Sequence, residues 1–424
     1  MKIHIKNGHV IDPRNGVDGV QDLFVAAGKV VALGQAPDGF HANRTIVATG
    51  LAVCPGLVDL SARLREPGYE YKATLESEMA AAVAGGVTSL VCPPDTDPPL
   101  DEPGLVEMLK YRAKNLNQAR VFPLGALTQK LAGEELTEMA ELADAGCIAF
   151  SHAEAPLSDS TVMMRAMQYA TTFGFSVWLR PQDASLARNG VAHDGEVATR
   201  LGLPAIPSCA ETIALSAILL LARETGAKIH VCRLSSREGI AMVRQAKGQG
   251  LPVTCDVGVH HAHLSELDIG FFDSNCRLVP PLRSQRDRDA IREGLRDGTI
   301  DALCSDHSPV DDDAKIRPFA EAEPGATGLE LLLPLTLKWA AETGASLSEA
   351  VAKISSRPAA VLGLDNASLA PGHGADICVF DPRAWWKVEP GALKSQGKNT
   401  PFLGLEVQGK VRYTLVEGHV VYEG

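Results

Sequence analysis

Several features that would identify a class of protein at once are missing from this 424-residue sequence. Its 40 basic residues are outnumbered by 52 acidic ones and form no stripe, which argues against nucleic acid or an anionic membrane surface as a partner. No two cysteines have the C-x-x-C spacing of a zinc or redox motif. The apolar run in ETIALSAILLLARETG is too short to cross a bilayer and is soon closed by charged residues.

The nine cysteines are dispersed and odd in number, and many lie inside apolar runs. Such cysteines are typical of buried, reduced thiols in a cytosolic protein. The first residues, MKIHIKNGHVIDP, alternate in polarity and then turn, which predicts a strand rather than a signal peptide. We therefore expect a cytoplasmic protein without a membrane partner.

The two ends of the chain have the same pattern of short strands around turns that contain glycine. IHIKNGHVID and DLFVAAGKVVALG stand near the start, and ADICVFDP and VRYTLVEGHVVYEG near the end. Neither end can bury the face of a sheet alone. We predict one small composite β domain formed by residues 1–54 and 366–424 together.

Residues 55–365 alternate between apolar runs and helical patterns, most of which end in glycine. The eight runs occur in GLVDLSARL, VTSLVCPP, ARVFPLGAL, CIAFSHA, FSVWLRP, KIHVCRLS, PVTCDVGVHH and IDALCSDHSP. Apolar strands that alternate with helices predict an α/β fold, here a (β/α)₈ TIM barrel. A doubly wound open sheet is the weaker alternative, because no glycine-rich dinucleotide motif follows the first strand.

Active sites of such barrels lie where the strands end and the next loops begin. Unusually many of these positions carry charged or histidine side chains. In chain order the residues at these strand ends are Ser61, Arg63, Arg65, Asp95, Thr96, His152, Glu154, Arg180, Asp183, His230, Arg233, His260, His261, His263, Asp306 and His307.

Several segments resemble, in order and nearly end to end, the signature segments of bacterial dihydroorotases in the cyclic amidohydrolase superfamily. They are PGLVDLSARLREPGYEYK, GGVTSLVCPPDTDPP, GLPAIPSCAE, AKGQGLPVT, PPLRSQRD, DGTIDALCSDHSP and PGATGLE. The resemblance implies a metal-dependent hydrolase barrel beside a small β domain. It is closest to the non-catalytic dihydroorotase-like companions of bacterial aspartate carbamoyltransferase.

Active members of that family bind zinc through side chains after strands one, four, five, six and eight. The resemblance places these positions on Ser61 and Arg63, at or beside His152, and on Arg180, Arg233 and Asp306. Arginine has no lone pair to give to a metal and is always charged. We therefore expect no zinc or other cofactor and no catalytic residue, with Asp306 as a remnant of the lost ligand and base.

The substrate-binding positions implied by the resemblance are also altered. Arg65 matches the residue that binds the substrate carboxylate, but Asp95 and Val279 stand where asparagines are expected. A carboxylate at position 95 would repel the substrate. We expect Arg63, Arg180 and Arg233 to converge near Asp306, where cation–carboxylate pairing would replace the metal, and we interpret the histidines of VHHAHL as supports of the fold.

Three hypotheses follow from the sequence. The first is a non-catalytic protein of pyrimidine biosynthesis that assembles with aspartate carbamoyltransferase, as a dimer within a larger hetero-oligomer. The second is an active cyclic amidohydrolase with an atypical metal site. The third is a metal-free module in which the arginines at the strand ends hold a carboxylate or phosphate.

Overall fold

The eight predicted strands form one parallel barrel in the structure, a computed structural model that describes residues 1–424. Their order around the barrel is β15-β14-β13-β10-β9-β8-β7-β6. The strands are β6 (Leu57–Asp59), β7 (Val87–Cys92), β8 (Arg120–Ala126), β9 (Ala149–Ser151), β10 (Ser176–Leu179), β13 (Lys228–Val231), β14 (Val253–Gly258) and β15 (Ala302–Cys304). The sequence prediction of a TIM barrel is confirmed.

The barrel closes just beyond the ends of its first and last strands. The amide of Arg63 donates to the carbonyl of His307 at 2.9 Å, and the amide of His307 donates to the carbonyl of Ser61 at 3.1 Å. These bonds fix the loops after β6 and β15 to each other. Two predicted site positions, 63 and 306, are thereby held on adjacent backbones.

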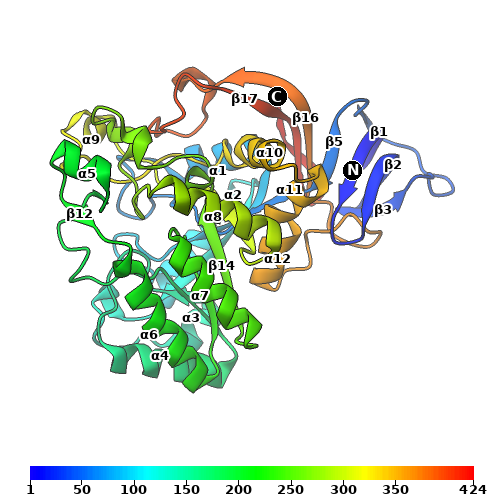
Figure 1. Ribbon diagram of the computed structural model, residues 1–424. Helices are drawn as coiled ribbons and strands as arrows, with labels where there is room; N and C mark the ends of the chain where they lie inside the picture. Colours follow the sequence, from blue (N-terminus) through cyan, green and yellow to red (C-terminus); the bar gives the residue numbers. More distant parts are fainter.

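Helices cover the outside of the barrel, and several have the end signals that the sequence predicts (Figure 1). The helix after Ser284 begins with a capping box and ends at Gly298, whose φ of 82° few other residues adopt. The helices are α1 (Leu75–Ala84), α2 (Pro103–Asn115), α3 (Met139–Ala145), α4 (Ser160–Phe173), α5 (Glu196–Leu201), α6 (Cys209–Thr225), α7 (Arg237–Gly248), α8 (Gln285–Asp297), α9 (Asp312–Ile316), α10 (Leu332–Thr343), α11 (Leu347–Lys353) and α12 (Ser356–Leu362).

Short elements fill the connections between these helices and strands. Two brief strands pair in parallel, and five segments form single 3₁₀ turns. They are β11 (Ala192–His193), β12 (Ala205–Ile206), η1 (Gln129–Leu131), η2 (Val259–Ala262), η3 (Glu266–Ile269), η4 (Ser274–Cys276) and η5 (Pro390–Ala392). None of the helices is long and apolar enough to pass through a membrane.

A second sheet combines strands from both ends of the chain, as predicted (Figure 1). Its order is β18-β17-β16-β5-β1-β2-β3, with β4 paired to β1. The two halves meet where β5 and β16 run antiparallel, with Cys54 opposite Cys378. The strands are β1 (Lys2–Asp12), β2 (Val17–Ala26), β3 (Lys29–Leu33), β4 (Arg44–Val47), β5 (Ala52–Pro55), β16 (Ile377–Lys387), β17 (Glu406–Val416) and β18 (His419–Glu423).

The segment between β16 and β17 reaches back to the barrel. The side-chain nitrogen of Asn399 donates to the carbonyls of Ser308 and Gly325, both at 3.0 Å. Its oxygen accepts from the amide of Val310 at 3.1 Å. Because Asn399 is buried, these bonds lie out of competition with water. The terminal domain therefore helps to hold the loop after β15 in place.

Candidate functional site

Three guanidinium groups meet inside the mouth of the barrel. Arg63 follows β6, Arg180 follows β10 and Arg233 follows β13. Their side chains are only 7%, 6% and 5% exposed, so water cannot neutralise their charges. A folded protein can bury positive charges of this kind only where carboxylates pair with them.

Glu154, in the loop after β9, contacts all three guanidiniums. Its Oε1 accepts from Arg63 Nη2 at 2.9 Å and from Arg233 Nη1, and its Oε2 lies 2.6 Å from Arg180 Nε. Burial by itself raises the pKa of Glu154, but the three guanidiniums outweigh burial and hold this pKa well below its usual range. The carboxylate of Glu154 is therefore the anionic centre of the cluster.

Two further carboxylates complete the cluster. Asp306 Oδ1 lies 3.1 Å from Arg233 Nη1 and 3.7 Å from Arg63 Nη1. Asp95 Oδ2 accepts from Arg63 Nε at 2.8 Å. Burial raises the pKa of Asp306, against the opposing effect of the two arginines. With Glu154, three carboxylates balance three guanidiniums.

Arg63 and Arg233 pair with Asp306, whereas Arg180, in the same cluster, makes no ion pair with it. The strand order explains this result, because β10 is separated from β15 by β13 and β14 but lies beside β9. Arg180 therefore reaches the carboxylate that follows β9, which is Glu154. The sequence offered Glu154 only as one of many residues at the strand ends.

Of the two other predicted ligand positions, His152 has both ring nitrogens engaged within the protein, and Ser61 makes hydrogen bonds through its backbone. His152 Nδ1 faces the carbonyl of Ala155 at 2.9 Å, and its Nε2 faces the hydroxyl of Thr128 at 2.8 Å. Nδ1 must therefore carry the proton, which leaves Nε2 to accept from the threonine. Ser61 gives its backbone carbonyl to Ser305 Oγ at 3.1 Å. Neither residue presents a free lone pair of an imidazole or thiolate to the mouth.

The mouth of the barrel does not fit a zinc ion. Zinc is held by three or four nitrogen, sulfur or oxygen donors, and no group of three or more His, Cys, Asp or Glu side chains is arranged to provide them. The cavity bordered by Ser61 and the three arginines measures only about 20 Å³. That volume suits about one water molecule. The donor set and the space both disfavour a divalent cation.

The predicted substrate-binding residues also make internal contacts. Arg65, at a φ of 64°, donates from Nε to the carbonyl of Pro309 at 2.8 Å. Asp95 pairs with Arg63, as described above. Val279 offers only its backbone carbonyl, 3.4 Å from Arg233 Nη1. These residues form part of the packing of the mouth.

The histidines of VHHAHL bond to the backbone. Each Nε2 faces a carbonyl, of Thr327 for His260, Pro280 for His261 and Leu335 for His263, at 3.3, 3.0 and 2.8 Å. Burial lowers the pKa of His260 to about 3 and those of His261 and His263 to about 4. All three rings are therefore neutral at pH 7 and hold neighbouring loops.

Sequence reasoning missed a buried hydrogen bond between a histidine and a glutamate. His307 Nε2 lies 2.5 Å from Glu78 on α1, and both side chains are fully buried. Glu78 also accepts from Ser395 Oγ at 2.7 Å and from the amide of Gln396 at 2.9 Å. His307 therefore serves this contact and not a dyad with Asp306. The signal for it was a glutamate on the apolar face of α1.

Thiols offer no replacement site at the mouth. Cys232 and Cys304 are the cysteines nearest to the ends of β13 and β15. Burial raises the pKa of both thiols well above the ordinary value. A buried thiol that stays protonated is neither a nucleophile nor a metal ligand.

Comparison with known families places the chain clearly. A family model described as dihydro-orotase-like matches residues 50–239, and an amidohydrolase family model matches residues 191–422. A dihydroorotase-like protein of Pseudomonas aeruginosa is 45% identical, with both chains covered completely. One from Pseudomonas putida is 44% identical, over 100% of this chain and 99% of its own.

Similarity extends to proteins with a different printed name and to solved structures. A dihydroorotase of Geobacter metallireducens is 41% identical over the full length of both chains. The structure of an L-hydantoinase (dihydropyrimidinase) from Arthrobacter aurescens superimposes with a TM-score of 0.89 at 25% identity, covering 99% of this chain and 96% of its own. The chain is thus almost as similar to a protein named dihydroorotase as to proteins named dihydroorotase-like. The residues of the barrel mouth must therefore decide whether it has the chemistry of an enzyme.

Proposed function

Because the chain belongs to the dihydroorotase-like family of amidohydrolases, we propose that it is a non-catalytic member that serves as a structural partner of aspartate carbamoyltransferase in pyrimidine biosynthesis. One observation carries the non-catalytic part of the proposal. Glu154 ties together three guanidiniums at positions where the family resemblance places metal ligands. The mouth is closed by its own ion pairs.

The chemistry of amide hydrolysis supports this reading. A metal-dependent amidohydrolase lowers the pKa of a bound water toward neutrality to make hydroxide. Here the carboxylate that resembles the family's general base, Asp306, is paired with Arg233 and Arg63. The carboxylates of the cluster are already paired with arginines, and a carboxylate alone cannot readily generate hydroxide.

The two alternatives make different use of the same residues. An active amidohydrolase is favoured by the 41% identity to a protein named dihydroorotase, but it requires ligands other than those in the mouth. An anion held by the whole arginine cluster is disfavoured, since three carboxylates already balance the three guanidiniums. The cavity of about 20 Å³ also leaves no room for such a ligand.

Metal content and turnover test the non-catalytic part. We expect the purified full chain to contain no stoichiometric zinc by inductively coupled plasma mass spectrometry, and not to interconvert dihydroorotate and carbamoyl aspartate. A dihydroorotase prepared in the same way serves as the positive control. One or more tightly bound zinc ions per chain, with turnover lost to a chelator, would favour the active enzyme.

An exposed apolar surface supports the proposed partnership with aspartate carbamoyltransferase. It consists of Leu267, Phe271, Phe272 and Ile316, of which Phe271 is 90% and Ile316 80% exposed. The two phenylalanine rings lie 5.3 Å apart. Lys315, next to Ile316, donates to the carbonyl of Ser274 at 3.0 Å, which brings α9 against η4. Aromatic side chains grouped in this way are typical of interface centres.

Arg277 beside this surface lacks an anionic partner. Its Nε and Nη1 are buried without a hydrogen-bond acceptor, and burial lowers its pKa to about 10. Lys315 Nζ lies 3.3 Å from the carbonyl of the same residue, so the nearest added charge is also positive. A carboxylate from the carbamoyltransferase would remove the penalty of this uncompensated charge.

Co-expression with the host's carbamoyltransferase tests the partnership, with the product sized by light scattering. We expect a joint assembly that survives Arg63→Ala, provided that the barrel folds. The double variant Phe271→Glu/Ile316→Glu should abolish it. A matched control, Val20→Glu/Val47→Glu, introduces the same charges at exposed residues of the terminal sheet and should leave the assembly intact. If the unmodified chains run separately at micromolar concentration, and the transferase alone is stable and active, the partnership is wrong.

A further inference from the structure

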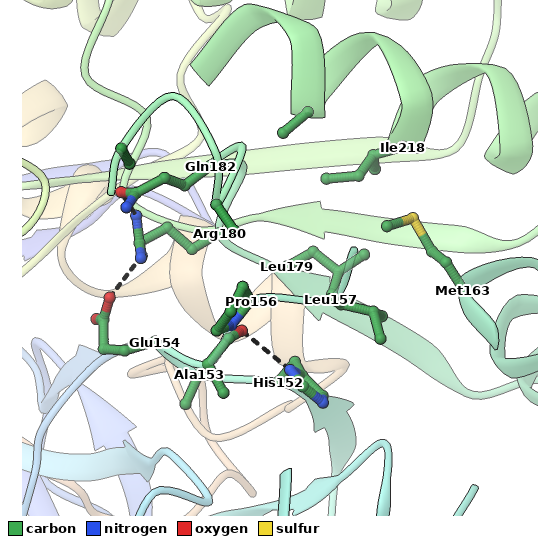
Figure 2. Close-up of a pocket in the computed structure, with 14 residues that line it drawn as sticks. His152, Ala153, Glu154, Pro156, Leu157, Met163, Leu179, Arg180, Gln182 and Ile218 are labelled. Carbon is green, nitrogen blue, oxygen red and sulfur yellow. Dashed lines mark hydrogen bonds and ion pairs between the residues drawn. The ribbon is translucent and has the colours of Figure 1, made fainter. Parts of the chain in front are cut away.

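A pocket of about 180 Å³ lies beside the arginine cluster, between the loops after β9 and β10 and the helices α4 and α6 (Figure 2). It shares Arg180 and Glu154 with the cluster, but Arg63 and Arg233 do not line it. Nothing in the proposed scaffold role uses this space.

One end of the pocket presents hydrogen-bond donors. Arg180 donates from Nη1 to Gln182 Oε1 and points its Nε at Glu154, as Figure 2 shows. A guanidinium can only donate, so Gln182 turns its oxygen toward Arg180 and its amide nitrogen away. No hydrogen bond within the protein uses Arg180 Nη2 or the amide nitrogen of Gln182.

The remainder of the lining is apolar. Figure 2 shows Leu157, Met163, Leu179 and Ile218 surrounding the pocket on the side away from Gln182. Small side chains leave the space between them open. These are Ala184, Ala187 and Ala214. An apolar cavity of roughly 150 Å³ accepts a benzene ring, so a compact apolar group fits here.

Arg180 is also the least compensated guanidinium of the cluster. Arg63 has Asp95 and Arg233 has Asp306 in addition to Glu154, whereas Arg180 has Glu154 alone. Burial lowers the pKa of each of the three arginines, and the neighbouring carboxylates raise it. The net result is a lowered pKa only for Arg180. A second anion near Arg180 would therefore be stabilised.

We propose that this pocket binds a small monocarboxylate whose apolar body has about the volume of a benzene ring. The carboxylate would accept from Arg180 Nη2 and from the amide nitrogen of Gln182, and the body would lie against Leu157, Met163 and Ile218. Charge-assisted hydrogen bonds at one end and apolar contact at the other fix the orientation of such a ligand. The inference stands whether or not the chain assembles with a transferase.

Isothermal titration calorimetry of the full chain with sodium benzoate tests this site, with benzamide as the neutral ligand of the same shape. We expect saturable binding of one benzoate per chain and roughly tenfold weaker binding of benzamide, because the charge-assisted bonds are lost. The variant Gln182→Leu should weaken benzoate binding several-fold.

A second variant protects the test against misfolding near the cluster. Ala214→Phe fills the pocket from α6 and leaves the residues Arg180 and Gln182 unsubstituted, and it should abolish benzoate binding while the melting temperature stays close to that of the parent. Equal binding of benzoate and benzamide, no binding of benzoate by the parent chain, or full binding by Ala214→Phe would overturn the proposal.

Discussion

Replacing Glu154 with glutamine tests whether one carboxylate holds the barrel mouth together. Glutamine keeps the shape of the side chain and one acceptor oxygen, but it leaves three buried guanidiniums with two carboxylates, Asp95 and Asp306. Breaking a buried ion pair costs about 3–5 kcal/mol. Glu154 contacts three partners but is 32% exposed, so water offsets part of the loss. We expect the free energy of unfolding to fall by about 3–4 kcal/mol.

Urea denaturation is the suitable assay, since urea adds no ions that would screen the cluster. The fluorescence of Trp178, which is buried inside the barrel, contributes to the signal. Glu134→Gln is the matched control, because it makes the same change of charge at an exposed side chain without a partner. A loss below about 1 kcal/mol for Glu154→Gln, as for a surface ion pair, would refute the cluster as a source of stability.

Two further substitutions separate the contributions of other buried groups. Asp306→Ala should lower the free energy of unfolding by about 1–3 kcal/mol. This loss is smaller than that for Glu154→Gln because burial already disfavours the charged form of Asp306. An unchanged melting temperature would mean that Asp306 and its arginine partners are solvated. Burial lowers the pKa of His263 to about 4, whereas the pKa in the unfolded chain is about 6.5. The contribution of the neutral ring to the free energy of unfolding is therefore fully present above pH 6.5 and is lost as the pH falls toward 4. His263→Gln keeps a donor for Leu335 and should reduce proton uptake on unfolding at pH 5 by about one, measured from the slope of stability against pH; an unchanged slope would contradict the neutral ring.

Most of the fold could be predicted from the sequence because strands and helices of a TIM barrel leave strong local patterns. Each of the eight predicted apolar runs contains a barrel strand, and helix ends such as Gly298 follow from backbone preferences. The pairing of the two chain ends followed from the need to bury both β faces. The contact of Asn399 with the loop after β15 was not predictable, since it joins segments about 90 residues apart through one polar side chain.

The site was predictable in its positions but not in its pairings. Reading strand ends located Arg63, Arg180 and Arg233, because a barrel brings these ends together wherever its loops go. Which carboxylate faces them depends on strand order and on local backbone geometry. Ala153, at a φ of 49°, turns the chain immediately before Glu154, and such a conformation is uncommon for alanine. No sequence pattern marks that turn.

If the chain is the non-catalytic family member proposed above, charge balance explains how its barrel mouth stays folded without a metal. Divalent cations neutralise the carboxylates of such a mouth, and removal of the cations alone would leave Asp306 and its neighbours as uncompensated anions. Arginine at the positions where the family resemblance places metal ligands supplies positive charge, but three guanidiniums exceed what Asp306 can balance. Glu154 and Asp95 restore neutrality. On this proposal, the substitutions that would remove the reaction also stabilise the barrel, and they leave Arg180, with one shared carboxylate, as the guanidinium proposed to receive an external anion.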